Sequence, residues 1–232
     1  MTKLYQTELD SNEFAFIYLG YAGILLRIRD LTIAFDPADY LSKVKSKIST
    51  LDFITYSHSH YDHYTLRDAV SLYKISKAHI ISEFSMVEEL QSKIPSDMIT
   101  AGPETFRTVR DEMVVDFKGA RFKMHRGVHP RQIIQFRVKL GKVRIFHGAD
   151  SGYWPVGKQK VDVAFIPTGK PSPTCAPGVG LAMVMDIKPT FALAMHGSDK
   201  QCKKFKELVE NEVPETKVII PKVNELIKLS TK

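Results

Sequence analysis

Cysteine and long apolar runs are scarce in this sequence. Its 232 residues include two cysteines, Cys175 and Cys202, which is too few for the disulfide framework on which small secreted proteins depend. No uninterrupted apolar run approaches about 18 residues, and the chain does not open on a charged and then apolar leader, so we expect neither a membrane span nor secretion. These absences favour a cytoplasmic protein.

The composition is that of an ordinary globular protein. Hydrophobic residues make up 44% of the chain and charged residues 25%, with no low-complexity segment and no short internal repeat. This length is ample for a sizeable core. We therefore expect one domain over residues 1–232.

Negative charge is missing from one long segment. From Lys118 to Arg144 the chain has nine basic residues and no Asp or Glu, within a protein of net charge +7. Two interpretations stand: the polar faces of two or three strands, or a positive rim beside a functional site that attracts an anionic ligand. The nine are Lys118, Arg121, Lys123, Arg126, Arg131, Arg137, Lys139, Lys142 and Arg144.

The densest polar cluster follows an apolar strand in ITYSHSHYDH, residues 54–63. It contains His58, His60, Asp62 and His63. Each of these groups needs a partner when it is desolvated, and a metal ion can serve all four. Imidazole nitrogen and carboxylate oxygen suit zinc, manganese or iron, and the lack of cysteine argues against a closed structural zinc site. His58 and His60 point the same way on an extended chain, so Asp62 and His63 would point in another direction. This arrangement suggests two neighbouring metal positions.

This HxHxDH motif resembles that of the metallo-β-lactamase superfamily, and the chain offers the superfamily's later ligands in order. They are His129 in VHP, Asp150 in HGADSGY and His196 in AMHGSD. The overall look is that of small bacterial and archaeal metal-dependent hydrolases of the L-ascorbate-6-phosphate lactonase type. The resemblance implies an α+β fold, a four-layer αβ/βα sandwich of two similar halves with the metals at one edge between the sheets.

The resemblance also implies the assignment of ligands. His58, His60 and His129 would hold one divalent cation, Asp62, His63 and His196 a second, and Asp150 would bridge the two. Zinc is most strongly supported, and manganese, iron and nickel also suit such sites. Hydrolysis by an activated water is the expected reaction, with Asp62 and Asp150 as catalytic residues.

Several residues are candidates for supporting roles. Asp36 precedes Pro37 at a strand end and either orients a ligand or forms a simple turn. His125 competes with His129 for the third ligand position, but the resemblance favours His129, because the superfamily places this histidine just before an apolar strand, here QIIQFRV. His147 matches a histidine that orients a ligand in the superfamily. Cys175 is interpreted as a small semi-buried residue rather than as a thiol beside the metals, and the role of Tyr21, where relatives carry histidine, stays open.

Periodicity predicts the elements around these motifs. We expect strands over residues 14–19, 24–28, 31–37, 78–82, 161–167, 190–195 and 218–221, a series of short strands from 98 to 147 that includes 106–111, and a polar tail after 221. Helices are expected over 65–76, around 84–94, over 177–187, and over 199–213 with Ser198 or Asp199 as the cap.

The expected substrate is a small anionic ester: a lactone, a carboxylic ester or a phosphodiester. Arg126 and Arg131 flank His129 and are the side chains expected to grip its phosphate or carboxylate. Two alternatives stand beside this: a phosphodiesterase or nuclease acting on nucleotides or RNA, and a non-catalytic metal-binding or scaffold protein. Nucleic acid is less favoured because no aromatic-interleaved basic strip is present. We expect no membrane partner, and the sequence leaves the oligomeric state open.

Overall fold

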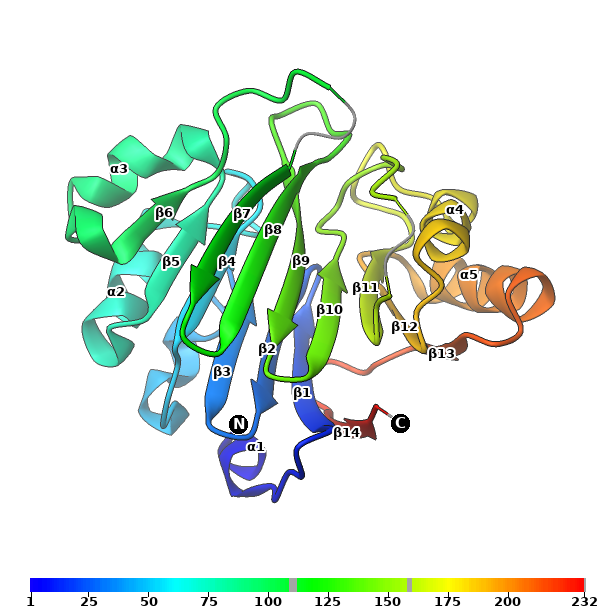
Figure 1. The fold of residues 1–232 in the computed structure, drawn as a ribbon, viewed down its shortest axis with the longest axis horizontal. Helices are drawn as coiled ribbons and strands as arrows, with labels where there is room; N and C mark the ends of the chain where they lie inside the picture. Colours follow the sequence, from blue (N-terminus) through cyan, green and yellow to red (C-terminus); the bar gives the residue numbers. More distant parts are fainter. Residues whose placement is uncertain (109–111, 158–159, 232) are drawn as a thin grey trace. The chain divides into compact units, whose positions relative to one another are not determined.

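The computed structural model describes residues 1–108, 112–157 and 160–231. The chain forms two compact units (Figure 1). Unit 1 comprises Met1–Glu104 and Lys222–Ser230, and unit 2 comprises Thr105–Pro221. Each unit is built on one seven-stranded mixed sheet, as the resemblance implied.

The sheet of unit 1 has the strand order β14-β1-β2-β3-β4-β5-β6. The pairs from β14 to β3 are antiparallel, and those from β3 to β6 are parallel. The strands are β1 (Glu13–Gly20), β2 (Gly23–Ile28), β3 (Leu31–Phe35), β4 (Phe53–Tyr56), β5 (His79–Ser82), β6 (Ile99–Ala101) and β14 (Leu226–Ser230).

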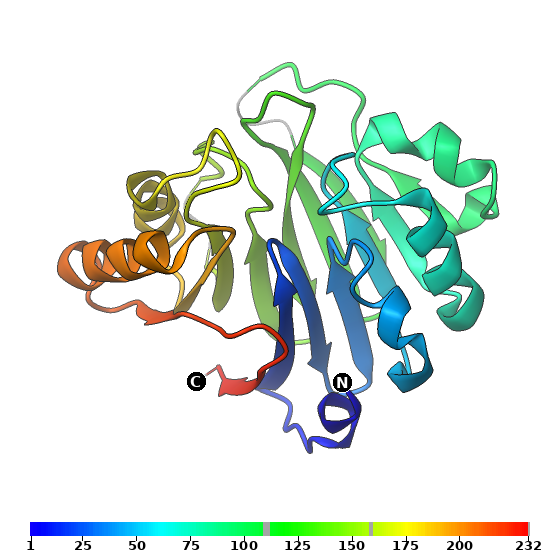
Figure 2. The same cartoon turned by 180° about the vertical axis from the view of Figure 1, so that it is seen from behind.

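Helices cover one face of this sheet. They are α1 (Thr2–Gln6), α2 (Leu66–Ser76) and α3 (Val87–Gln91), with the short 3-10 helices η1 (Ser42–Lys47), η2 (Phe84–Met86) and η3 (Ser96–Met98). Leu72 of α2 and Leu90 of α3 share a core with Ile17 and Ile54, which are strand residues on that face. Figure 2 shows α2 and α3, in cyan to green, alongside the strands of this sheet. Strand neighbours such as Phe16 point to the other face and are also buried. Burial on both faces explains why these strands are nearly continuous apolar runs in the sequence.

The helix after the histidine motif begins where the sequence predicts. Thr65 is the N-cap of α2, and its side chain accepts a hydrogen bond from the backbone N–H of Asp68. Lys77 ends the helix in the left-handed conformation. This N-cap fixes the residue at which the turn containing the histidine motif ends and the helix begins.

The sheet of unit 2 has the strand order β13-β12-β11-β10-β9-β8-β7. The pairs from β7 to β10 are antiparallel, and those from β10 to β13 are parallel. The strands are β7 (Glu112–Phe117), β8 (Ala120–Arg126), β9 (Ile134–Leu140), β10 (Val143–His147), β11 (Val163–Pro167), β12 (Phe191–Met195) and β13 (Lys217–Ile219). Both helices, α4 (Pro177–Ile187) and α5 (Asp199–Glu212), pack on the β10–β13 part of one face, where Val184 and Phe205 meet Ile166 and Ala194.

Strand alternation accounts for much of the acid-free basic segment. Phe122, Met124, Phe136 and Val138 are fully buried on one face of β8 and β9, so the residues between them point to the other face. Three basic side chains of that other face pair with acids from outside the segment: Arg121 with Asp116 at 2.6 Å, Lys123 with Glu112 at 2.6 Å, and Arg144 with Asp162 at 2.9 Å. For these three residues, the interpretation as the polar face of a sheet holds.

Two expectations about elements are wrong. Residues 106–108 form no strand, and the rest of the strand expected over 106–111 lies outside the described residues. The polar tail contains a strand, β14, whose Leu229 pairs with Phe14 of β1. Its alternation was hidden by lysine and serine, and pairing with a strand more than 200 residues away leaves no local signal. Among the described residues, no helix is long and apolar enough to cross a membrane.

Candidate functional site

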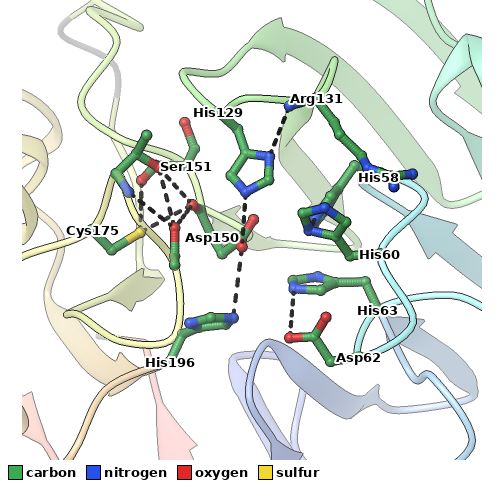
Figure 3. A network of polar contacts seen from close by, with 12 residues as sticks. His58, His60, Asp62, His63, His129, Arg131, Asp150, Ser151, Cys175 and His196 are labelled. Carbon is green, nitrogen blue, oxygen red and sulfur yellow. Dashed lines mark hydrogen bonds and ion pairs between the residues drawn. The ribbon is translucent and has the colours of Figure 1, made fainter.

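In unit 1, the end of β4 delivers the histidine motif into a tight turn. The backbone N–H groups of His63 and Tyr64 both donate to the carbonyl of His60, at 2.9 and 2.8 Å. This turn gathers three imidazoles: His58 Nε2 lies 3.0 Å from His60 Nδ1, and the ring centres of His58 and His63 are 4.2 Å apart (Figure 3). His58 and His63 are fully buried, whereas His60 is half-buried.

Asp36, directly after β3, holds this turn in place through polar contacts with Ser57 and His63. One carboxylate oxygen accepts from the backbone N–H of Ser57 at 2.7 Å. The other accepts from the Ser57 hydroxyl at 2.6 Å and lies 2.9 Å from His63 Nδ1. Because Asp36 engages Nδ1 of His63, it favours coordination through Nε2, which lies 3.7 Å from the carboxylate of Asp62. The sequence did not single out Ser57, although it directly precedes the first histidine of the motif.

In unit 2, Asp150 lies between two histidines. One of its carboxylate oxygens, Oδ2, is 3.3 Å from His129 Nε2 and 3.8 Å from His196 Nε2 (Figure 3). All three side chains are at most 3% exposed. Nδ1 of His196 lies 3.5 Å from the carbonyl of Gly169, so a proton held there leaves Nε2 as the coordinating atom. The unit thus assembles two imidazoles and a carboxylate from three separate turns.

The main chain is strained at these positions. Asp36, Ala149 and His196 adopt φ values of 39°, 53° and 48°. These values lie in the left-handed region, which residues other than glycine rarely occupy. Each of these residues is a site residue or the neighbour of one. Such strain costs of order 1–3 kcal/mol per residue and persists where surrounding contacts enforce it, most often at functional sites.

The carbonyl of Asp150 is held by side chains of the Pro-rich loop after β11. The hydroxyl of Ser172 donates to it at 2.7 Å, that of Thr174 at 3.2 Å, and the thiol of Cys175 at 3.0 Å. Burial raises the pKa of the Cys175 thiol to about 12, so the thiol keeps its proton at neutral pH and serves as a donor. This agrees with the interpretation of Cys175 as a small buried residue. The sequence analysis did not single out Ser172 or Thr174, although both lie within three residues of Cys175.

Ser151 joins the His129 loop to the Asp150 turn. Its hydroxyl accepts from the backbone N–H of Val128 at 2.8 Å, and the N–H of Gly152 donates to the carbonyl of Val128 at 2.7 Å. A Cβ atom on Gly127 would lie 2.7 Å from the Ser151 hydroxyl, so this close approach requires glycine. The residues on either side of His129 and Asp150 are therefore fixed against each other.

The structure also places the remaining predicted residues of unit 2. Arg131 donates its backbone N–H to His129 Nδ1 at 3.3 Å, and its side chain is exposed. Arg126 is also exposed and places its guanidinium 4.9 Å from the ring centre of Trp154. His125 lies on β8 with Nε2 3.8 Å from Glu112, and His147 is buried at the end of β10, with its ring 6.1 Å from that of Phe165.

The side chains present fit a divalent metal. Both sets combine imidazole nitrogens with carboxylate oxygens, and neither includes a thiolate. Four of the five imidazoles and the Asp150 carboxylate are buried, where uncompensated polar groups are costly and bound cations are a common compensation. Nitrogen and oxygen donors of this kind suit zinc and its first-row neighbours.

Two mixed sheets with flanking helices, and buried His–Asp sets at their strand ends, define the metallo-β-lactamase fold. The chain belongs to the β-lactamase superfamily domain family, whose profile matches residues 15–196.

Individual relatives agree with this membership. A protein named a UPF0173 metal-dependent hydrolase from Caldivirga maquilingensis is 26% identical over 234 residues, covering 93% of this chain and 98% of its own. Among solved structures, Igni18, described as a metallo hydrolase from Ignicoccus hospitalis, has a TM-score of 0.74 at 15% identity and covers 95% of this chain and 100% of its own. The metallo-β-lactamase fold protein YhfI from Bacillus subtilis has a TM-score of 0.70 at 15% identity, covering 94% and 99%.

Proposed function

We propose that this protein is a hydrolase that requires two divalent metal ions. The observation that carries the proposal is the pair of buried His–Asp sets in a chain of this family, one at the end of β4 and one around Asp150. The Caldivirga relative, which is similar to this chain over nearly its whole length, is named a metal-dependent hydrolase. That name supports the same class of activity. The scarcity of cysteine supports a cytoplasmic location.

The proposed ligands follow the family resemblance. His58, His60 and His129 would hold one ion, Asp62, His63 and His196 would hold the other, and Asp150 would be a ligand of both. Zinc is the ion that we propose, because imidazole-rich sites with carboxylate and no thiolate are common for catalytic zinc.

The chain's own residues then have distinct tasks. When bound, the cations supply an activated water and stabilise the negative charge that develops on the substrate. Asp62, whose side chain is 11% exposed, accepts or holds a proton at its carboxylate. Asp36 fixes the orientation of His63, and the three donors to the carbonyl of Asp150 fix the bridging carboxylate.

The substrate that we propose is a small anionic ester: a lactone, a carboxylic ester or a phosphodiester. Arg126 and Arg131 are exposed on either side of His129. A guanidinium can bind phosphate or carboxylate through two hydrogen bonds, which a neutral ester cannot accept in the same way. We therefore expect kcat/KM for an anionic substrate to exceed that for its neutral analogue, with the difference reduced by salt and by Arg131→Ala.

Metal analysis tests the centre. Purified protein should carry up to two divalent ions per chain, and His58→Ala and Asp150→Ala should each lower that number. Matched controls are His79→Ala, at a histidine of β5 that hydrogen-bonds Thr100 of β6, and Asp116→Ala, at a carboxylate paired with Arg121. Unchanged metal content in both site variants would refute the assignment.

A substrate panel tests the activity. Lactones, carboxylic esters, phosphodiesters and short RNA should be incubated with the metal-loaded protein and with Asp62→Asn. We expect turnover of a lactone or ester that Asp62→Asn abolishes. Turnover of RNA alone would favour a nuclease, and metal binding without any hydrolysis would favour a scaffold protein.

A further inference from the structure

A cation-rimmed groove lies on the helical face of unit 1, apart from every residue assigned above. It has a volume of about 500 Å³ and is lined by Leu66, Arg67, Val70 and Lys74 of α2, Lys45 of η1, and Lys93 after α3. The groove thus follows one side of α2 between two neighbouring segments of the helical layer.

The rim of the groove is strongly positive. Lys45, Arg67, Lys74 and Lys93 are all exposed, and none of the described residues that line the groove is acidic. Arg67 lies 3.5 Å from Asp68, but that carboxylate is 4% exposed and already accepts a hydrogen bond from Thr65. A solvent-facing cluster of this charge attracts anions over roughly a Debye length, about 8 Å at physiological salt.

The floor of the groove is apolar. Leu66 and Val70 are one helical turn apart, are partly buried, and pack against the hydrophobic core of unit 1. Their outer surfaces line the groove, so an occupant can bury an aliphatic group between charged contacts. Arg67 and Lys74 are seven residues apart on α2, which places their Cα atoms about 10 Å from each other along the helix axis.

We propose that this groove docks an acidic peptide segment of a partner protein, with an aliphatic side chain on Leu66 and Val70 and carboxylates on the four cations. The charge of the rim selects an anionic partner, and the aliphatic floor selects one with an apolar anchor. Nucleic acid is a poorer match because the lining has no aromatic side chain on which bases could stack. A membrane surface is a poorer match because the feature is concave.

Fluorescence anisotropy with a labelled peptide of sequence Glu-Glu-Leu-Leu-Glu-Glu tests the proposal. We expect Arg67→Glu/Lys74→Glu to weaken binding at least about tenfold, and replacement of both peptide leucines by serine to weaken it as well. Lys204→Glu/Lys206→Glu on α5 makes the same change in net charge at exposed lysines of unit 2 and should leave the affinity within about twofold.

Three results would overturn the proposal. One is equal loss of affinity in the two double variants, which would reveal general charge attraction. Another is no dependence on the peptide leucines. The third is tighter binding of a uridine oligonucleotide or of phosphatidylserine vesicles with the same dependence on Arg67 and Lys74, which would assign the groove to another class of partner. Metal content and hydrolysis should be unchanged in Arg67→Glu/Lys74→Glu, so the outcome is separate from that for the proposed activity.

Discussion

At the scale of single residues, Asp36 has far more polar contacts than a strand-end turn requires. It accepts from the backbone and hydroxyl of Ser57 and contacts His63 Nδ1. Asp36→Asn keeps the shape of the side chain but removes the charge that stabilises a coordinating imidazole. We expect metal affinity to fall by about 10- to 100-fold, measured by competition with a chelating dye.

Asp52→Asn is the matched control for Asp36. Its carboxylate also accepts a backbone N–H, that of Thr32 at 2.7 Å, but contacts no histidine of the motif. Metal affinity should be unchanged in this variant. An equal loss in both variants would mean that Asp36 supports the fold of the unit rather than His63.

Ser172 makes the shortest of the three side-chain hydrogen bonds to the carbonyl of Asp150. Ser172→Ala removes a buried hydrogen bond but leaves the carbonyl its bonds from Thr174 and Cys175, so it should lower the free energy of unfolding by about 0.5–1.5 kcal/mol, measured by urea denaturation. If the contact also positions the carboxylate, metal affinity should fall. Ser76→Ala, which removes a hydroxyl bond to the helix carbonyl of Leu72, should leave metal affinity unchanged.

The burial of His125 predicts that the stability of the protein depends on pH. Burial and the nearby positive charge of Arg137 lower the pKa of His125 to about 4, although the carboxylate of Glu112 opposes part of this shift. The folded pKa lies below the unfolded value of about 6.5, so the stabilisation by neutral His125 is complete above pH 6.5 and is lost as pH falls toward 4. The shift corresponds to roughly 3 kcal/mol.

The measurement compares wild type with His125→Gln, which cannot titrate. Between pH 7 and pH 4, wild type should lose about 3 kcal/mol more of its free energy of unfolding than the variant. The difference isolates His125, because every other histidine is the same in both proteins. Parallel pH curves would contradict the prediction.

At the scale of elements, the helix that follows His196 depends on its first residues. Ser198 caps α5 and forms a capping box with Gln201. Ser198→Ala should therefore destabilise the protein by about 1 kcal/mol, measured by urea denaturation. The N-cap of α4, Ala176, has no side-chain bond, so Ala176→Ser should be neutral or stabilising. Destabilisation of similar size in both variants would show that capping is not the cause.

At the scale of the whole molecule, the proposed metal ligands come from both units. Bound metal should therefore stabilise each unit against opening. Hydrogen exchange measured with and without a chelator should show protection by metal in β4 and the turn after it, and also in the segments around His129, Asp150 and His196. Metal-dependent protection confined to one unit would contradict the proposed assignment of ligands.

The sequence by itself determined the elements and the residue types of the site. Short apolar runs and alternating apolar residues located nearly all strands, Thr65 and Ser198 located helix starts, and HxHxDH placed four candidate ligands within six residues. These signals are local, since side-chain direction along a strand and capping at a helix end depend on residues a few positions apart.

Tertiary structure alone decided what supports the site and which ends pair. Asp36 meets Ser57 and His63 across 21 and 27 residues, Ser172 meets Asp150 across 22, and β14 pairs with β1 across the length of the chain. The pairing of β7 to β10 directed part of the basic segment to a face where Asp and Glu from outside it neutralise three of its charges. Such contacts depend on strand order and register, which the sum of many weak packing terms selects and no short motif encodes.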